Sequence, residues 1–128
     1  MLSFELKLFP GVYAVCQLPP GAPVPAWARG DDLLALIRTP DELTVVCEGA
    51  NIPSGVRVER GWRALKVAGP LEFSMVGVLA SLSGALAQAG VSIFALSTFD
   101  TDFLLLKKAQ VETAIQALEN AGHTIDRL

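Results

Sequence analysis

Two aspartates after an apolar run are the residues of this chain best suited to bind a small charged molecule. Asp100 and Asp102 separate two apolar, strand-like segments, residues 91–99 and 103–106, which places both in the turn of a hairpin. A carboxylate there can hold an amino group or a cationic side chain through a charge-assisted hydrogen bond. Asp also bonds the backbone of its own turn, an equal explanation for Asp100. Asp102 lies at the mouth of an otherwise apolar strand, and for this residue we favour the interpretation that the carboxylate binds a ligand.

A complementary positive group is expected upstream, where residues 73–77 open an apolar helix. The free N–H groups and positive dipole end of a helix start can receive a carboxylate, and Gly77 lets a ligand approach the backbone. Ser74 can add a hydroxyl or simply cap the helix, the commoner role of serine there. Thr98 can bind ligand or merely favour strand. The predicted ligand-binding residues are Ser74, Met75, Val76, Gly77, Thr98, Asp100 and Asp102.

Other chemistry finds little support in the sequence. His123 is the only histidine, and its position after Gly122 suits a cation at a helix C-terminus. Cys16 and Cys47 lie in apolar strand-like runs, where thiols behave as small hydrophobes, with a disulfide or redox pair as the minority alternative. Trp27 and Trp62 could stack on a ligand, but both are expected to fill a core, as such residues more often do. No phosphate-binding loop is present. We therefore predict no catalytic residue, no metal site and no cofactor.

The elements that position the two aspartates follow from hydrophobic spacing. Leu79, Leu82 and Leu86 repeat with the period of a helix, and after Gly90 the period becomes that of a strand. Gly90 supplies the left-handed residue that ends the helix. A second amphipathic helix is predicted over residues 109–121, with Gly122 as its C-cap, and a closing strand starts at residue 124.

From Trp62 onward the predicted order is strand, helix, strand, strand, helix, strand, which is the split βαβ of the ferredoxin-like fold. Right-handed crossovers place both helices on one face of a four-stranded antiparallel sheet. The fold class is therefore α+β, with strands predicted at residues 56–58 and 62–67 before the first helix.

The first half of the chain is predicted to be a degenerate copy of this unit. Residues 4–8 and 12–18 form a hairpin around Pro10-Gly11, and prolines keep residues 19–30 in a loop. Strands follow at 33–38 and 44–48, with one helical turn at 39–42. Sliding the sequence by sixty positions aligns Leu33-Leu34-Ala35-Leu36 with Ile93-Phe94-Ala95-Leu96. We predict tandem units, a helix-poor one over 1–61 and a complete one over 62–128.

The composition of the chain limits the kinds of partner that it can bind. The chain has 128 residues, is 52% hydrophobic and carries a net charge of −3, which argues against nucleic acid or anionic lipid as a partner. Residues 73–99 are uncharged and long enough to span a membrane, but five serines, three glycines and the change of period argue against a span. Residues 1–9 contain Glu5 and Lys7 and no signal-peptide core, so a cytoplasmic protein is expected.

Two motifs carry a family resemblance. The stretch from Gly77-Val78-Leu79-Ala80 to Gly90-Val91-Ser92-Ile93 resembles the ACT domain, a ligand-binding regulatory module. Trp62-Arg63-Ala64-Leu65 and the run from Ser97 to Leu105 resemble small bacterial paired-ACT proteins and, more remotely, the eukaryotic cytosolic arginine sensors. The resemblance implies a βαββαβ fold, amino-acid binding at domain or subunit interfaces, and no chemistry by the module. The polar residue and proline that usually precede the ACT glycine are replaced by Met75-Val76.

Two functions are consistent with these features. The first is a non-catalytic regulatory protein that binds a free amino acid at an ACT–ACT interface and signals to a partner protein or to its own dimer. The alternative is a ligand-independent interaction module, in which small residues of the first helix let another subunit pack closely: Ala80, Ser83, Gly84 and Ala87. A homodimer is predicted in either case, because a four-stranded unit leaves strand edges and one sheet face open.

Overall fold

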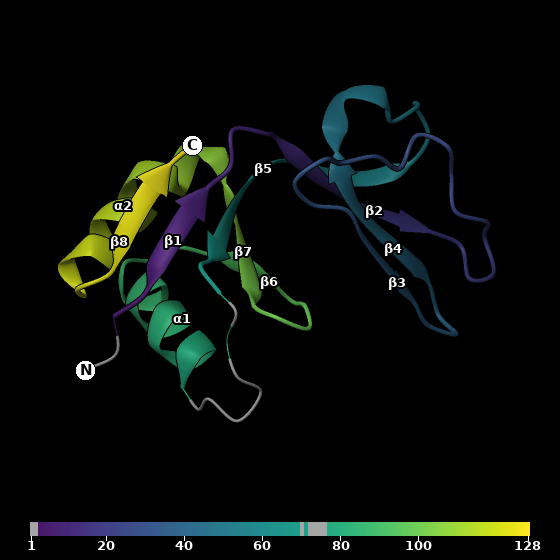
Figure 1. Cartoon of the computed structure of the whole chain (residues 1–128). Coiled ribbons are helices and arrows are strands. Elements are labelled where there is room, and N and C mark those ends of the chain that lie inside the picture. Colours follow the sequence, from purple (N-terminus) through teal and green to yellow (C-terminus); the bar gives the residue numbers. More distant parts are fainter. Residues whose placement is uncertain (1–2, 70, 72–76) are drawn as a thin grey trace. The chain divides into compact units, whose positions relative to one another are not determined.

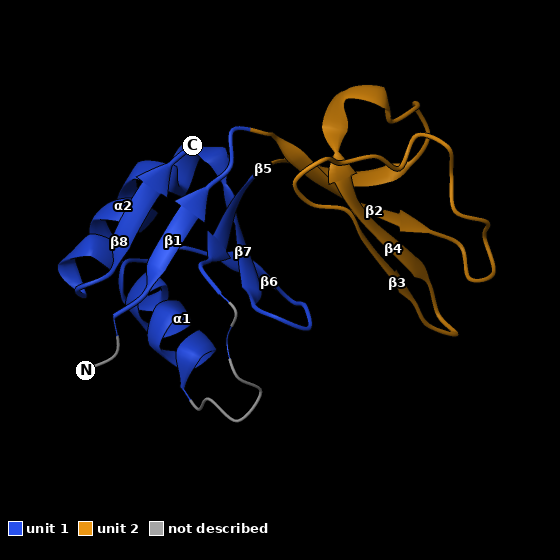
Figure 2. Cartoon of the chain, in the orientation of Figure 1, with its two compact units in different colours: residues 1–10, 63–128 blue, residues 11–62 orange. Residues whose placement is uncertain are grey.

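The computed structural model describes residues 3–69, 71 and 77–128 of the chain. It divides into two compact units, shown in Figure 2: unit 1 comprises residues 1–10 and 63–128, and unit 2 comprises residues 11–62. The predicted division into domains 1–61 and 62–128 stays a prediction, since compactness alone does not define a domain.

Unit 1 contains the predicted ferredoxin-like sequence of elements (Figure 1). From the later half of strand β5 onward the order is βαββαβ, so the α+β fold class is confirmed. Its elements are β1 (Glu5–Leu8), β5 (Arg57–Val67, shared with unit 2), α1 (Val78–Gln88), β6 (Ile93–Ser97), β7 (Asp102–Lys107), the 3₁₀ turn η2 (Lys108–Gln110), α2 (Val111–Asn120) and β8 (Thr124–Arg127).

The sheet of unit 1 has one strand more than predicted. Its order is β8-β1-β5-β7-β6, because β1 lies between β5 and β8, antiparallel to the first and parallel to the second. Leu6 is opposite Val67 on one side and Ile125 on the other. The predicted four-stranded sheet and the predicted hairpin of residues 4–18 are therefore wrong: β1 and β2 each pair with β5 and not with each other.

Both helices cover the same face of this sheet, as predicted. Leu82 and Leu86 of α1 and Leu118 of α2 are fully buried in one core with the strand residues Leu6 and Leu104. Burial of each such side chain contributes about 1.5–3 kcal/mol. None of the described helices is both long and apolar enough to cross a membrane.

The helix ends are set by glycine, as the sequence predicts. Gly90 and Gly122 have φ values of 76° and 96°, the left-handed region that a side chain disfavours. After each glycine the chain turns back: the N–H of Val91 donates to the carbonyl of Leu86, and that of His123 donates to Leu118. These are Schellman caps, which satisfy carbonyls that the helix leaves without partners.

His123 has a different role from the predicted helix-terminal cation. Its ring is 3% exposed and stacks on Phe4, and its Nδ1 accepts a hydrogen bond from the Phe4 backbone N–H at 3.0 Å. Burial lowers the pKa of His123 below its ordinary value. The ring is therefore a neutral acceptor that joins β8 to the start of the chain, and the prediction of a cation is wrong.

Because the His123 ring is neutral in the folded chain, we predict that the stability of the fold depends on pH. The pKa of His123 is about 6.5 in the unfolded chain and lower in the folded chain. Above about pH 6.5 the free energy of unfolding therefore keeps its full value. As the pH falls further, the unfolded chain binds a proton first, and the free energy of unfolding decreases until the pH reaches the folded pKa. His123→Asn keeps an acceptor for the Phe4 N–H without a titrating group. We expect urea unfolding between pH 7 and 5 to show a smaller loss in this variant. Equal losses in both proteins would contradict the role of His123.

Unit 2 is a helix-poor sheet. Its strands are β2 (Tyr13–Leu18), β3 (Ala35–Arg38), β4 (Leu43–Glu48) and the earlier half of β5, in the order β3-β4-β2-β5, with one 3₁₀ turn, η1 (Gly49–Asn51). The helical turn predicted at 39–42 is a hairpin loop instead, in which the Thr39 hydroxyl accepts the N–H groups of Asp41 and Glu42. The side-chain hydrogen bonds of a helix cap are present. However, Arg38 of β3 pairs with Leu43 of β4, and the loop between them is too short for a helix.

Strand β5 is continuous where two strands were predicted. The pairs Tyr13–Trp62 and Val15–Glu59 leave Arg60 and Gly61 opposite a single residue of β2. Gly61 has a φ of 83°, so the strand continues through a bulge that needs glycine. The sequence signal for a break thus marks a real irregularity within one strand.

The core of unit 2 is small and holds both cysteines. Cys16 and Cys47 are buried free thiols, and Trp27 from the proline-rich loop packs against the same cluster. Burial raises the pKa of Cys16 to about 11 and raises that of Cys47 as well. Both are therefore unreactive thiols that serve as small hydrophobic side chains, as predicted.

Candidate ligand-binding pocket

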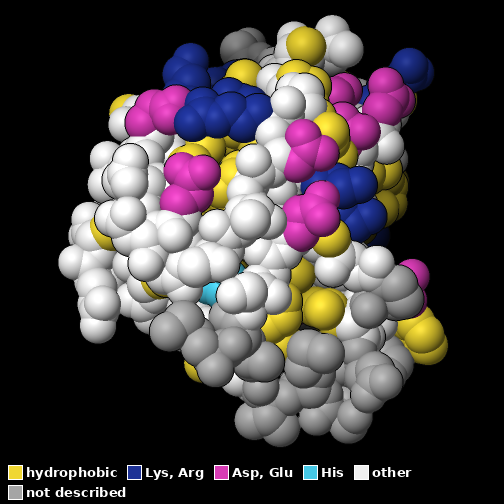
Figure 3. Space-filling model, turned by 60° about the vertical axis from the view of Figure 1, so that its left-hand side comes forward, with side chains coloured by type: hydrophobic (Ala, Val, Ile, Leu, Met, Phe, Trp, Pro, Cys, Tyr) yellow, Lys and Arg dark blue, Asp and Glu magenta, His cyan; other side chains and the backbone are white. Residues whose placement is uncertain are grey.

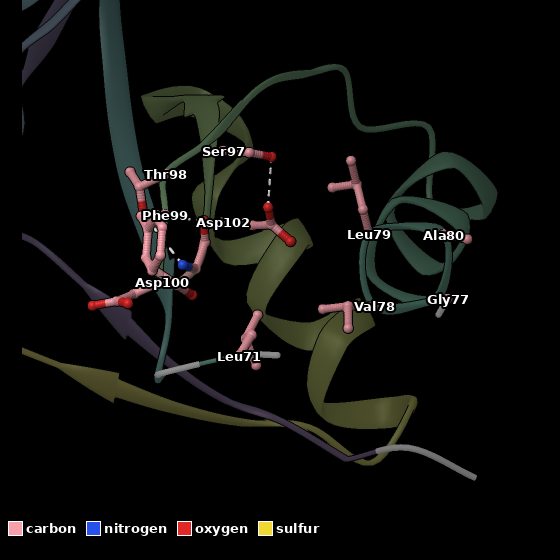
Figure 4. Close-up of a pocket in the computed structure, with 11 residues that line it drawn as sticks. Leu71, Gly77, Val78, Leu79, Ala80, Ser97, Thr98, Phe99, Asp100 and Asp102 are labelled. Carbon is pink, nitrogen blue, oxygen red and sulfur yellow. Dashed lines mark hydrogen bonds between the residues drawn. The ribbon is translucent and has the colours of Figure 1, made fainter. Parts of the chain in front are cut away.

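A cavity of about 330 Å³ lies in unit 1 between the start of α1 and the hairpin that joins β6 to β7 (Figure 4). Four predicted ligand-binding residues line it: Gly77, Thr98, Asp100 and Asp102. The other three, Ser74, Met75 and Val76, lie outside the described residues. The remaining lining residues are Leu71, Val78, Leu79, Ala80, Ser97, Phe99 and Thr101.

The start of α1 supplies a positive end to the pocket. Gly77 is the N-cap with a φ of 85°, and it has no side chain to cap the helix. The carbonyl of Gly77 accepts the first helical hydrogen bond, from the N–H of Ser81. By helix geometry, the N–H groups of Val78, Leu79 and Ala80 have no carbonyl within the helix to bond. They carry the positive end of the helix dipole at the pocket wall.

Asp102 supplies the negative end. It stands opposite Ser97 in the β6–β7 ladder, and the Ser97 hydroxyl donates to Asp102 Oδ1 at 2.6 Å. A charge-assisted bond of this length fixes the direction of the carboxylate. Figure 4 shows the Asp102 side chain pointing toward α1 and the Asp100 carboxylate pointing the opposite way. Asp102 is thus the acidic group that faces the helix start.

The turn that carries these residues is held in place by its own backbone bonds. The Thr98 hydroxyl accepts the Thr101 N–H at 3.2 Å and lies equally far from the Thr101 carbonyl, to which it donates. Buried Thr101 donates from Oγ1 to the carbonyl of Val67 at 2.6 Å, and the Leu71 N–H donates to the Asp100 carbonyl. The hydroxyl of Thr98 therefore serves the turn, and the hairpin is tied to the end of β5.

Gly69 permits this close packing of the turn. A Cβ added at Gly69 would stand 3.2 Å from the Asp100 carbonyl oxygen and 3.3 Å from the Thr101 side chain. Few real Cβ atoms have so close a neighbour, so a side chain here would push the hairpin away. The pocket wall thus depends on a glycine that the sequence analysis did not single out.

Sequence reasoning missed Ser97 and Phe99 as pocket residues. Ser97 could have been found from the hairpin itself, because a turn over residues 98–101 places residue 97 opposite Asp102. Phe99, at the tip, is 79% exposed and had no periodic signal. Together with Leu71, Val78 and Leu79 it gives the cavity an apolar lining beside its polar ends.

The charges of the pocket favour a ligand that carries a positive group. Among the described lining residues, Asp100 and Asp102 are the only charged ones. Nowhere do the described residues bring three or more His, Cys, Asp or Glu together as metal ligands. Elsewhere, in the view of Figure 3, acidic and basic side chains lie next to one another rather than in separate patches. What the pocket offers is a carboxylate, helix N–H groups and apolar walls, which together suit a small zwitterion.

Comparison with known proteins places this fold in a family. The family model of the ACT domain matches residues 57–120, half of the chain. The chain therefore belongs to the ACT domain family. A second model, which describes an N-terminal domain, matches residues 11–55, within unit 2. The α+β fold class with an ACT unit of ferredoxin-like topology is confirmed, and the tandem arrangement with a degenerate first ACT unit stays a prediction.

Individual relatives agree with this assignment. A crystal structure of a protein from Agrobacterium tumefaciens is 37% identical, with a TM-score of 0.93 over 100% of this chain and 96% of that one. The human cytosolic arginine sensor for mTORC1, subunit 1, is 34% identical over 59 residues, which are 45% of this chain and only 18% of the sensor. The regulatory subunit of aspartate kinase from Thermus thermophilus is 14% identical, with a TM-score of 0.64 over 91% of this chain and 97% of its own, and shows the fold alone.

Proposed function

We propose that this chain is a non-catalytic regulatory protein that binds a free amino acid in the pocket of unit 1. The observation that carries the proposal is the Asp102 carboxylate facing the start of α1 within one cavity. An amino acid has an ammonium and a carboxylate joined by one carbon. In the pocket, the Asp102 oxygens can bind the ammonium, and the helix N–H groups can bind the carboxylate.

The size and lining of the cavity support the same ligand class. About 330 Å³ is at the small end of ligand pockets, as a single amino acid requires. The ligand's side chain would contact Leu71, Leu79 and Phe99, which line the cavity. Because Asp100 and Asp102 are the charged residues of the described lining, an acidic ligand side chain would meet repulsion.

The name of one relative supports a sensing role. The protein that is 34% identical over 59 residues is named as a cytosolic arginine sensor. That name describes a response to an amino acid. A cytoplasmic location, a homodimer and a regulated partner protein are further parts of this proposal.

A thermal-shift screen of the twenty amino acids tests the proposal. At about a hundred times its dissociation constant, a bound ligand stabilises the fold by about 2.7 kcal/mol, which raises the melting temperature by several degrees. The matched controls are the N-acetyl and the amide forms of the active amino acid, each of which lacks one of the two charges. We expect neither to bind well. If no amino acid moves the melting temperature, the proposal fails.

The alternative is a ligand-independent interaction module, and one observation favours it. Phe99 and Leu79, at the pocket, are 79% and 36% exposed, and the small residues Ala80, Gly84 and Ala87 lie on the exposed side of α1. Exposed apolar groups beside small residues suit close packing of a protein partner. This function predicts no thermal shift with any amino acid.

A further inference from the structure

We propose that the pocket of unit 1 selects amino acids with a neutral, apolar side chain, and that Leu79 and Phe99 set this preference. The inference rests on the proposed function, because it concerns the part of the ligand beyond its ammonium and carboxylate. It names a ligand class from which both acidic and basic amino acids are excluded.

The pocket has one carboxylate in position to bind a cation, and the ammonium of the ligand needs it. The Ser97 hydroxyl donates to Asp102 Oδ1 at 2.6 Å, which leaves Oδ2 for that ammonium. Asp100 also lines the cavity, but its carboxylate points the opposite way from that of Asp102 (Figure 4). Among the described lining residues, a second cation on the ligand therefore meets no second carboxylate that faces α1. A cation that leaves water without a partner carries a desolvation cost, so basic side chains are disfavoured.

The neutral polar side chains of the hairpin already use their protons within it. The Ser97 hydroxyl donates to Asp102. The Thr98 hydroxyl donates to the Thr101 carbonyl, and the Thr101 hydroxyl donates to the Val67 carbonyl. A hydroxyl has one proton, so none of the three can donate to a ligand without breaking its present bond. A polar ligand side chain would thus lose its bonds to water without equal replacement.

Large apolar side chains complete the described lining. They are Leu71, Val78, Leu79 and Phe99, and Figure 4 shows Val78 and Leu79 on the side of α1 that faces Asp102. Val78 is buried in the core of unit 1, whereas Leu79 and Phe99 are 36% and 79% exposed. An apolar ligand side chain placed beside Leu79 and Phe99 removes apolar surface of both molecules from water, which favours binding.

The first test compares norleucine with lysine by isothermal titration calorimetry of the full chain. The two side chains share four carbons, and lysine adds an ammonium at the end. We expect norleucine to bind at least about tenfold more tightly. Along the series alanine, 2-aminobutyrate, norvaline and norleucine, one methylene is added at a time. The affinity should rise at each step, by about fourfold for a methylene that is fully buried.

The second test uses Leu79→Ala and Phe99→Ala, whose side chains are exposed enough to be removed without loss of the fold. Each variant should lower the affinity for norleucine by about threefold or more and change that for alanine by less than about twofold. A variant that only disturbed the helix start or the hairpin would weaken both ligands equally. The matched control is Val24→Ala, which is 51% exposed, does not line this cavity and should leave both affinities unchanged.

Lysine binding as tightly as norleucine, or equal affinities along the homologous series, would overturn the inference and leave amino-acid binding intact. Equal effects of both variants on alanine and norleucine would reject Leu79 and Phe99 as the residues that set the preference. If neither norleucine nor any of the twenty amino acids binds, the proposed function fails and this inference fails with it. The two failures are therefore distinguished by whether any amino acid binds.

Discussion

Asp102→Asn is expected to abolish most of the melting shift that the active amino acid gives with the parent protein. The carboxylate of Asp102 faces the start of α1 and accepts a hydrogen bond from the Ser97 hydroxyl. Replacing this carboxylate with an amide removes the charge that would pair with the ligand's ammonium. At a fixed ligand concentration, most of the expected 2.7 kcal/mol should be lost. Differential scanning fluorimetry of both proteins over a ligand titration measures the effect.

Asp100→Asn is the matched control for this experiment. Asp100 has the same charge, lies two residues away in the same hairpin and points away from Asp102 (Figure 4). We expect it to keep at least half of the shift and both variants to fold without ligand, because neither carboxylate belongs to the hydrophobic core. Full binding by Asp102→Asn, or equal loss in the two variants, would count against the assigned role of Asp102.

Leu82→Ala is expected to destabilise the chain by about 2–5 kcal/mol. Leu82 is fully buried on the inner face of α1, in the core that both helices share with the sheet, and a large-to-small change there loses transfer energy and leaves a cavity. The melting temperature should fall by more than about 8 °C. Urea unfolding of the parent and the variant gives the free-energy difference directly.

Leu79→Ala serves as the control on the same helix. Leu79 is 36% exposed at the pocket, so the same change should cost less than about 1 kcal/mol. If the two substitutions cost the same, α1 would not pack through the face that holds Leu82. The start of the helix would then have no firm support for a ligand.

Local signals in the sequence were sufficient to predict the helices and strands around the pocket. Gly90 and Gly122 end the helices where predicted, because the left-handed conformation is a property of one residue and the turn that follows it. The β6–β7 hairpin was predicted for the same reason, since its strands and turn are contiguous in sequence. Asp102 was favoured over Asp100 as a ligand contact from its place at the mouth of β7; its side chain points toward α1, and its role stays a prediction.

Pairing between distant segments was beyond the same reasoning. Residues 4–18 have the composition of a hairpin, but β1 gains more by burying Leu6 and Leu8 on both sides between β5 and β8. No periodicity in ten residues reveals a partner more than a hundred positions away. The role of His123 was missed for the same reason, because the N–H that it accepts belongs to Phe4.

The position of β1 has a consequence for the order in which the chain can fold during synthesis. Strand β1 leaves the ribosome first, yet its partners are residues 65–67 and 124–127. Unit 2, whose residues 11–62 are contiguous, can complete its sheet while unit 1 still lacks both helices. Strand β1 can pair with β5 once residues 65–67 have emerged, but its other edge stays open until β8 emerges, and the candidate pocket forms in the unit that closes second.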